Sequence, residues 1–257
     1  MPAKIIVTAG GTREPLDRVR SITNSSTGRM GAALVDAFAE RGFDVLWIHG
    51  PGSERPRAAC VERPVDTVAS VETALKAACA DPSVVAVVHA MAVSDYRPVR
   101  PLTARDLLLY IAGAVDEADI ERRLARLAEE APPLPGKLPS DKPWLPLLVP
   151  TIKLLDHLRS WAANPRLVLV SFKLTVGQTE ARLLEIAQKQ LNRTMSDLVV
   201  ANDLEMFEGR EHLAWLVDRN HAEGPVTGRA NIADRVAARV GHLLERGTDP
   251  EEQGLRE

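Results

Sequence analysis

A loop near the start of the chain combines glycines and hydroxyl residues in a pattern suited to binding anions. Residues 8–31 read TAGGTREPLDRVRSITNSSTGRMG, and they follow an apolar run and precede a helical pattern. Gly10 and Gly11 would let backbone amides approach a phosphate. Ser26 and Gly28 stand just before the helix, whose free amides would point toward the same ligand. A tight turn and a helix cap would use the same residue types, so these residues alone leave both interpretations open.

Four arginines in this loop favour the anion-binding interpretation. They are Arg13, Arg18, Arg20 and Arg29. Glu14 and Asp17 could neutralise two of them, but a positive surplus would remain beside the glycine turns. We therefore expect a loop that holds polyanionic ligands.

Two familiar classes of nucleotide site do not match this sequence. The loop is neither GxGxxG nor GxxxxGK[ST], the patterns of dinucleotide and P-loop sites. A short-chain reductase would need a Tyr-x-x-x-Lys pair on a helix. The nearest segment, YRPVR at residues 96–100, ends in arginine and contains a proline. A Rossmann-type NAD(P)-dependent reductase is therefore the weaker alternative.

Apolar runs and helical patterns alternate along most of the chain. Strands are expected at residues 4–9, 44–50, 84–93, 166–174, 197–203 and 212–218, and helices at 30–42, 68–80, 179–193 and 231–247. The strands lack polar alternation, which is typical of a parallel sheet covered on both faces. The pattern predicts an α/β fold with a doubly wound, mostly parallel, Rossmann-like sheet. In such folds, ligands bind at the carboxyl ends of the strands.

The middle of the chain departs from this alternation. Residues 104–131 read as a helix with a break near Gly113, and seven prolines follow between residues 132 and 150. Prolines neither continue a helix nor suit a central strand, so we expect an irregular Pro-rich flap. The predicted organisation is one domain over residues 1–247, with the flap within 100–150, and a polar tail over 248–257.

Composition and charge restrict the classes of function. A net charge of −3 over 257 residues gives no reason to expect nucleic acid or an anionic membrane as a partner. Cys60 and Cys79 lack CxxC spacing, so neither a zinc site nor a disulfide framework is indicated. The chain has no signal-peptide pattern and no apolar run long enough to span a membrane. We expect a cytoplasmic protein.

Four motifs together resemble those of one enzyme family. TAGGTREPLDRVRSITNSSTGRMG, AMAVSDY, SFKL and DLVVANDL occur in the order and at the spacings seen in phosphopantothenoylcysteine synthetase, also called phosphopantothenate–cysteine ligase. The resemblance runs from about residue 4 to about residue 245. Because the chain starts directly at the first synthetase strand, it is similar to the separate, single-function form, and no flavin is expected.

The resemblance implies a reaction in two steps. The family activates the carboxylate of 4′-phosphopantothenate with CTP or ATP, which releases pyrophosphate and leaves an acyl-nucleotide. The amine of L-cysteine then displaces the nucleotide. The implied partners are these substrates, Mg²⁺ and a second copy of the chain, since the family forms homodimers. The choice between CTP and ATP stays open, and a non-catalytic nucleotide-binding module of the same fold is the main alternative.

The resemblance also assigns roles to residues that would contact the acyl group. Asn24 aligns with an asparagine at the activated acyl group, Arg20 with a substrate-binding arginine, and Lys137 with a lysine of the flap. Met91 and Ala92 would present their backbone to the intermediate. Without the resemblance, Asn24 could stabilise a turn, Met91 and Ala92 could belong to the core, and Lys137 could be a solvated surface residue.

The implied nucleotide site adds residues from later strands. Asp95 would lie at the nucleotide and could contact Mg²⁺, and Phe172 would lie near the base, although Ser171 precedes it where the family often has glycine. Asn202 and Asp203 end a strand at the same edge, with roles left open. The expected site is completed by Gly10, Gly11, Ser26, Gly28 and Lys137.

Two cations on one predicted helix face are further phosphate candidates. Lys189 and Arg193 are four residues apart. The columns that bind phosphate in the fused form of the family are offset by one residue, and Gln190 and Thr194 occupy them in this chain. Lys189 and Arg193 are still the expected phosphate ligands on this helix.

Overall fold

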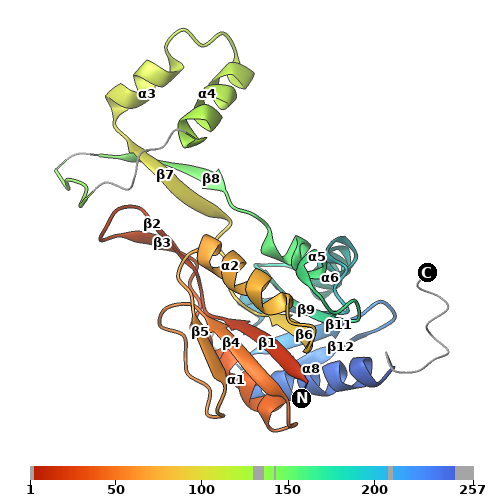
Figure 1. Cartoon of the computed structure of the whole chain (residues 1–257). Helices are drawn as coiled ribbons and strands as arrows, with labels where there is room; N and C mark the ends of the chain where they lie inside the picture. The colour runs from red at the N-terminus through yellow and green to blue at the C-terminus, as the bar shows by residue number, and fades with distance from the viewer. Residues whose placement is uncertain (1–2, 130–135, 142, 208–210, 247–257) are drawn as a thin grey trace.

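The body of the molecule is an eight-stranded sheet covered by helices, and an arm projects from it (Figure 1). The structure is a computed structural model that describes residues 3–129, 136–141, 143–207 and 211–246. The sheet strands are β1 (Lys4–Ala9), β4 (Asp44–His49), β5 (Val61–Pro64), β6 (Val84–His89), β9 (Val168–Thr175), β10 (Leu198–Asp203), β11 (Leu213–Val217) and β12 (Ala222–Thr227). They are ordered β12-β11-β10-β9-β6-β1-β4-β5. The pairings β10–β11 and β11–β12 are antiparallel, and the other pairings of this sheet are parallel. The predicted doubly wound, mostly parallel, Rossmann-like α/β sheet is confirmed.

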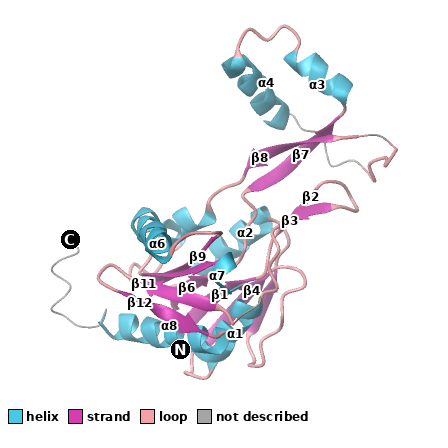
Figure 2. Cartoon of the chain, turned by 180° about the vertical axis from the view of Figure 1, so that it is seen from behind, coloured by secondary structure: helices cyan, strands magenta, loops and turns pink. Residues whose placement is uncertain are grey.

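Helices cover both faces of this sheet (Figure 2). The helices of the body are α1 (Arg29–Ala39), α2 (Val68–Cys79), the short 3₁₀ helix η1 (Leu154–Asp156), α5 (Leu158–Trp161), α6 (Glu180–Thr194), α7 (Leu204–Phe207) and α8 (Arg229–Arg246). Along β1, Ile5 and Val7 belong to the core under α1 and α8, and Ile6 belongs to the core under α2 and α5. Because both faces of the strand are buried, it shows no polar alternation.

The predicted strands and helices of the body are present with shifted ends. The helix expected to end at Gly42 ends at Ala39, and Gly42 then takes the left-handed conformation (φ 81°). The strand expected to reach residue 93 ends at His89. Strands β5 and β12 were not predicted, because both are exposed edge strands that contain proline and few buried apolar residues.

The arm consists of a two-stranded ribbon with a pair of helices at its far end (Figure 1). The ribbon pairs β7 (Tyr96–Leu102) with β8 (Leu145–Pro150) in antiparallel register, and the helices are α3 (Ala104–Ile111) and α4 (Glu117–Glu129). Gly113 lies between the helices at φ 68°, which confirms the predicted break.

The prediction of an irregular flap throughout residues 132–150 is wrong at its end, where β8 forms. Each strand of a two-stranded ribbon has one unpaired edge, so it accepts prolines that a central strand would exclude. Pro101 of β7 stands opposite Pro146 of β8, and the register shifts between Pro98 and Arg100. Residues 130–135 and 142 of the predicted flap lie outside the described residues.

The arginine-rich loop contains a short hairpin that was predicted only as loop. Its strands are β2 (Arg13–Pro15) and β3 (Ser21–Thr23). Glu14 on β2 accepts a hydrogen bond from the backbone N–H of Val68, the first residue of α2, at 2.7 Å. Burial raises the pKa of Glu14, and this hydrogen bond partly opposes the effect. The hairpin is thus fixed between the N-terminus of α2 and β7, which β2 also contacts.

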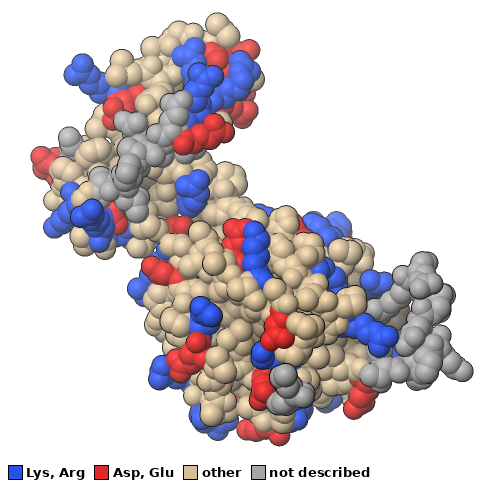
Figure 3. Space-filling view, viewed as in Figure 1, with Lys and Arg blue, Asp and Glu red and all other residues tan. Residues whose placement is uncertain are grey.

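Acidic and basic side chains are interspersed over both the body and the arm on the face shown in Figure 3. Among the described residues, no helix has the length and apolar character needed to cross a membrane. The predicted tail, residues 248–257, lies outside the described part of the chain.

Candidate functional site

The loops that follow β1 and β6 are joined side by side at the carboxyl edge of the sheet. The backbone N–H of Ala92 donates to Gly10 O at 2.8 Å, and Thr12 N–H donates to Ala92 O at 3.3 Å. The buried Thr12 hydroxyl accepts from Ser94 N–H and donates to Ser94 Oγ, both at 2.9 Å. These bonds extend the parallel pairing beyond the strand ends and give the edge a fixed backbone.

The glycines of this edge allow three loops to pack closely. Gly10 and Gly28 both have positive φ, at 77° and 71°. A Cβ on Gly10 would lie 2.0 Å from Ser53 Oγ, and one on Gly28 would lie 2.7 Å from Ser53 Cβ. A Cβ on Gly11 would lie 2.5 Å from Asn24 O. The observed contacts match the tight-turn interpretation, and phosphate binding by these glycines stays a prediction.

Asn24 connects the arginine-rich loop to the segment after β6. Its Nδ2 donates to Val93 O at 3.0 Å, and the residue is exposed. Of the residues expected nearby, Met91 is 7% exposed and packs in the core under α2 and α5. The N–H of Met91 donates to Thr8 Oγ1, and the N–H of Ala92 donates to Gly10 O. The structure brings Asn24 beside this segment, whose Met91 and Ala92 N–H groups both have protein partners, and contact of this backbone with the intermediate stays a prediction.

His89 is a buried neutral group beneath the same edge. Its Nδ1 lies 3.0 Å from Thr8 Oγ1. The same hydroxyl accepts from Met91 N–H, so it links His89 to the segment after β6. Burial lowers the pKa of His89 to about 4. The residue therefore holds the end of β6 in place and is uncharged at neutral pH.

Asp95 forms an ion pair that the sequence did not predict. Its Oδ1 accepts from Lys153 Nζ, and its backbone O accepts from Thr151 N–H at 2.9 Å. Its side chain is 62% exposed at the edge. Lys153 lies three residues after the end of β8, so this pair also joins the arm to the sheet edge. A lysine between a proline-rich stretch and an apolar helix gives no recognisable motif.

Asp95 is the candidate ligand for Mg²⁺, and metal binding at this residue stays a prediction. In the described part of the chain, no three His, Cys, Asp or Glu residues lie together as a cage. Asp95 offers one carboxylate with Lys153 on one of its oxygens. Mg²⁺ retains waters and takes phosphate ligands readily, so a single carboxylate is compatible with a metal that arrives on a nucleotide.

The two cations of α6 both form ion pairs. Lys189 Nζ lies 2.6 Å from Glu185 Oε1, and Lys189 and Arg182 lower the pKa of Glu185 to about 2. Arg193 pairs with Asp156 of η1, three residues after Lys153. Arg193 is thereby linked to the site through η1, whereas Lys189 is engaged within its own helix.

The neighbours of these cations are structural. Gln190 Nε2 donates to Ser171 Oγ at 2.9 Å and to Phe172 O at 3.2 Å. Thr194 Oγ1 donates to Gln190 O at 2.8 Å. Phe172 itself is half-buried and packs against the core under α1 and α8. The serine that precedes Phe172 is therefore part of a buried hydrogen-bonded group.

Asp203 holds the connection between β9 and α6. Its carboxylate accepts from Thr175 Oγ1 at 2.7 Å and from the N–H groups of Gly177 and Gln178. Burial raises the pKa of this group, but the hydrogen bonds outweigh it and hold the pKa below its ordinary value. Asn202 is buried beside it at the end of β10. We assign Asp203 a structural role.

The arginines of the first loop divide into paired and unpaired groups. Arg20 pairs with Asp17 at 2.6 Å, and Arg29 pairs with Glu54 at 2.9 Å. Glu14 accepts a hydrogen bond from the first residue of α2 instead of pairing with an arginine of the loop. Arg13 and Arg18 are exposed, and no ion pair to either is found among the described residues. A positive surplus therefore remains on the hairpin, as the sequence predicts.

The flap residue Lys137 lies beside the turn of the β2–β3 hairpin. The next residue, Leu138, donates its N–H to Asp17 Oδ2 at 3.0 Å and accepts from Arg20 Nη2 at 2.9 Å. Lys137 is exposed. The structure thus places the predicted flap lysine beside Arg20, at the opposite end of β3 from Asn24.

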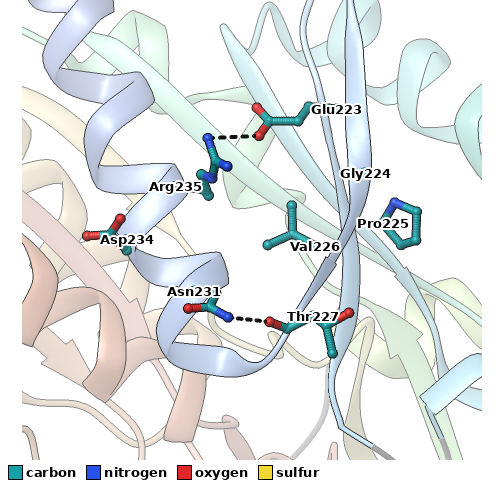
Figure 4. A pocket seen from close by; sticks show the side chains of 8 residues that line it. All are labelled: Glu223, Gly224, Pro225, Val226, Thr227, Asn231, Asp234 and Arg235. Atoms are coloured by element: carbon teal, nitrogen blue, oxygen red, sulfur yellow. Dashed lines mark hydrogen bonds and ion pairs between the residues drawn. The ribbon is translucent and has the colours of Figure 1, made fainter.

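A separate hollow of about 430 Å³ lies at the outer edge of the sheet between β12 and α8 (Figure 4). It is crossed by the Glu223–Arg235 ion pair at 3.3 Å and by a hydrogen bond from Asn231 Nδ2 to Thr227 O. None of the predicted site residues lines it. The hollow is open and polar, and the carboxyl edge of β1 and β6 remains the candidate site.

Comparison with known proteins finds similar sequences and structures along most of the chain. Residues 2–106 match the family model of the DNA/pantothenate metabolism flavoprotein C-terminal domain. The coenzyme A biosynthesis bifunctional protein CoaBC of Thermococcus kodakarensis is 31% identical over 242 residues, which cover 94% of this chain and 51% of the relative. The crystal structure of the DNA/pantothenate metabolism flavoprotein from Streptococcus pneumoniae superposes with a TM-score of 0.79 at 28% identity, covering 93% of this chain and 99% of that one. The match to this family model covers residues 2–106, and the relative and the solved structure are similar to nearly the whole chain.

These similarities confirm the resemblance to phosphopantothenoylcysteine synthetases that the motifs predict. A structure of a Cab2 mutant in complex with phosphopantothenate-cysteine has the same fold, with a TM-score of 0.68 at 20% identity over 96% of this chain and 89% of that one. The chain spans about half the length of the curated CoaBC relatives it matches. The reductase alternative loses its remaining support, because Tyr96 begins a strand and not a helix.

Proposed function

We propose that the chain joins 4′-phosphopantothenate and L-cysteine to give 4′-phosphopantothenoylcysteine, with CTP or ATP as co-substrate. The observation that carries this proposal is that Asn24 joins the arginine-rich loop to residues 91–95 at the sheet edge where the loop after β1 is also bonded. The names of the similar proteins agree with it, since they concern coenzyme A biosynthesis and a phosphopantothenate-cysteine complex.

In the first half-reaction, a carboxylate oxygen of 4′-phosphopantothenate attacks the α-phosphorus of the nucleotide, and pyrophosphate leaves. Both reactants are anions, so their repulsion has to be offset before attack. Arg13, Arg18 and Arg20 supply positive charge on the hairpin, and Lys137 adds a cation from the flap. Bound Mg²⁺ would neutralise charge on the nucleotide phosphates.

In the second half-reaction, the cysteine amine attacks the acyl carbon and the nucleoside monophosphate leaves, with loss of one proton from the amine. The bond from Asn24 Nδ2 to Val93 O fixes the orientation of the amide at the exposed edge. An amide nitrogen carries two donors, and we assign the second to the acyl oxygen, where negative charge develops.

The pair Asp95–Lys153 suggests how the nucleotide is received. Lys153 would transfer its contact from Asp95 to a phosphate, which would leave the Asp95 carboxylate for Mg²⁺. Arg193 would reach a phosphate by an analogous exchange of Asp156. Both exchanges replace one charge-assisted pair with another, so neither leaves a cation without an anionic partner.

Product analysis by mass spectrometry tests the proposal. The complete mixture of chain, 4′-phosphopantothenate, cysteine, Mg²⁺ and nucleotide should yield phosphopantothenoylcysteine, and omission of cysteine should leave the acyl-nucleotide. Nucleotide binding without either species would favour the non-catalytic module instead. Parallel assays with CTP and ATP would determine which nucleotide the site prefers.

We further propose that the ligase domain spans residues 1–247, acts in the cytoplasm and works as a homodimer. The arm supports the dimer. Leu108, Leu109 and Val115 on and beside α3 are 65%, 67% and 83% exposed. Exposed apolar side chains gathered on one projecting element are typical of an interface.

A further inference from the structure

Asp17 is a buried carboxylate that holds two distant segments of the chain together. Its side chain has no exposed surface. Within the hairpin, its oxygens accept from the N–H groups of Val19 and Arg20 and from Arg20 Nε and Nη2, at 2.6–2.9 Å. Oδ2 also accepts from Leu138 N–H at 3.0 Å, across 121 positions of sequence.

Arg20 completes this connection from the other side. Its Nη2 bonds both Asp17 Oδ2 and the backbone O of Leu138. Both polar groups of the Leu138 backbone are therefore held by one ion pair. The Leu138 side chain is 5% exposed, whereas the preceding Lys137 is exposed. The contact fixes the backbone of the segment and leaves its cation outside.

We propose that Asp17 is a positioning residue that latches residues 136–141 of the flap onto the β2–β3 hairpin and thereby places Lys137. The latch itself is a structural claim, and its effect on catalysis rests on the proposed function. Asp17 touches no substrate in this account. It acts through Leu138, the immediate neighbour of Lys137.

The bonding pattern distinguishes a latch from an ordinary buried ion pair. Two of the bonds to Asp17 close the turn of the hairpin and would form without the flap. The bond to Leu138 N–H serves only the flap, and charge-assisted bonds of this kind are about twice as strong as neutral ones. Asn in place of Asp17 would keep the size of the side chain but lose one acceptor oxygen and the charge that holds Arg20.

Amide hydrogen exchange at Leu138 tests the latch without any substrate. In Asp17→Asn, exchange of the Leu138 amide should accelerate by about tenfold or more, the change expected on loss of a hydrogen bond to a charged group. The matched control is Asp36→Asn. Asp36 is also a buried carboxylate with an arginine and two backbone N–H partners, but it holds Arg57 and Ala58.

In the control Asp36→Asn, amide exchange at Arg57 and Ala58 should accelerate, and the exchange rate at Leu138 should stay unchanged. Unchanged exchange at Leu138 in folded Asp17→Asn would overturn the latch. If Asp17→Asn does not fold, Arg20→Lys replaces it. Lysine keeps the charge but cannot bridge Asp17 and Leu138 with a planar fork, so Leu138 should again exchange faster, and an unchanged rate would equally overturn the proposal.

Catalysis tests the second part of the proposal. Formation of the acyl-nucleotide should slow in Asp17→Asn and in Lys137→Gln, and the double variant should be no slower than Lys137→Gln alone. Asp17→Glu keeps the charge and should restore part of the rate. Additive losses in the double variant would contradict positioning through Lys137. If the unmodified chain forms no acyl-nucleotide, the proposed function fails, and the exchange measurement still decides the latch.

Discussion

At the scale of single residues, buried polar side chains beneath the candidate site join its loops by hydrogen bonds, and other polar side chains are exposed at the surface of the site. Thr8, Thr12 and His89 are buried and hydrogen-bonded to one another's loops, while Asn24 and Asp95 are exposed. This division separates residues whose substitution should affect stability from residues whose substitution should affect the reaction.

His89 should make the stability of the fold depend on pH. Its pKa is about 4 in the folded chain and about 6.5 when unfolded, so between these values only the unfolded state binds the proton. Stability is then lost as pH falls from about 7 to about 4, by on the order of 3 kcal/mol.

Urea unfolding across this pH range would measure the loss. His89→Gln should remove that part of the slope, and the exposed His221→Gln should keep it. A slope that is the same in His89→Gln as in the unmodified chain would contradict a buried neutral histidine.

Asn24→Asp should separate binding from amide formation. The substitution keeps the shape of the side chain but places a negative charge beside an anionic intermediate. Nucleotide binding should be largely retained, and amide formation should fall by about 10²–10³, as on loss of an oxyanion donor. Rapid-quench measurement of acyl-nucleotide consumption, with exposed Asn220→Asp as control, checks this. Consumption at the unmodified rate would remove Asn24 from the mechanism.

At the scale of elements, close packing of helices on strands places the site loops. Gly31 lies within α1, and a Cβ there would stand 2.2 Å from Ala9 Cβ and 3.1 Å from Ala9 Cα. The helix therefore approaches the end of β1 more closely than any other residue would permit. This approach sets the position of the 24–28 loop, since the loop enters α1 directly.

Two helical glycines should respond oppositely to the same substitution. Gly31→Ala should destabilise the fold by about 1–3 kcal/mol, because the added methyl group overpacks the contact with β1. Gly241 in α8 has no atom within 4 Å of an added Cβ. Gly241→Ala should therefore stabilise by about 0.5–1 kcal/mol through higher helix propensity. Urea midpoints for both variants test this, and equal shifts would contradict the packing account.

The sequence predicted elements well where local pattern decides and poorly where long-range pairing does. Apolar strands and amphipathic helices of the body follow from periodicity. Strand β8 was missed because its prolines are acceptable only in a ribbon with free edges, which depends on pairing with β7.

The site residues show the same limit. The motifs pointed to Asn24 and Asp95 at one edge, and the structure places both there. The partners were not predictable, because Lys153 is 58 positions from Asp95 and Leu138 is 121 positions from Asp17. No local pattern records such contacts.

At the scale of the whole molecule, the arm is the element that most needs an explanation. It projects from the body and ends in α3 and α4 (Figure 1). Helix α3 has no buried residue, although its sequence is strongly amphipathic. An apolar helix face of this kind is expected to be covered in the assembled protein.

The proposed homodimer predicts the effect of charging this face. The unmodified chain should have the mass of two 28.0 kDa chains by light scattering, and Leu108→Glu with Leu109→Glu should shift it toward one. Arg105→Glu, on the same helix, serves as a charge control and should leave the dimer intact. A monomeric unmodified chain would contradict the proposal.

Release of pyrophosphate is the most direct test of the central claim. The account predicts that the chain releases pyrophosphate from CTP or ATP when 4′-phosphopantothenate is present. Turnover should continue only after cysteine is added, and the amount of pyrophosphate released should then equal the amount of phosphopantothenoylcysteine formed. Absence of pyrophosphate with both nucleotides in the complete mixture would contradict the assignment of this chain as a phosphopantothenate–cysteine ligase.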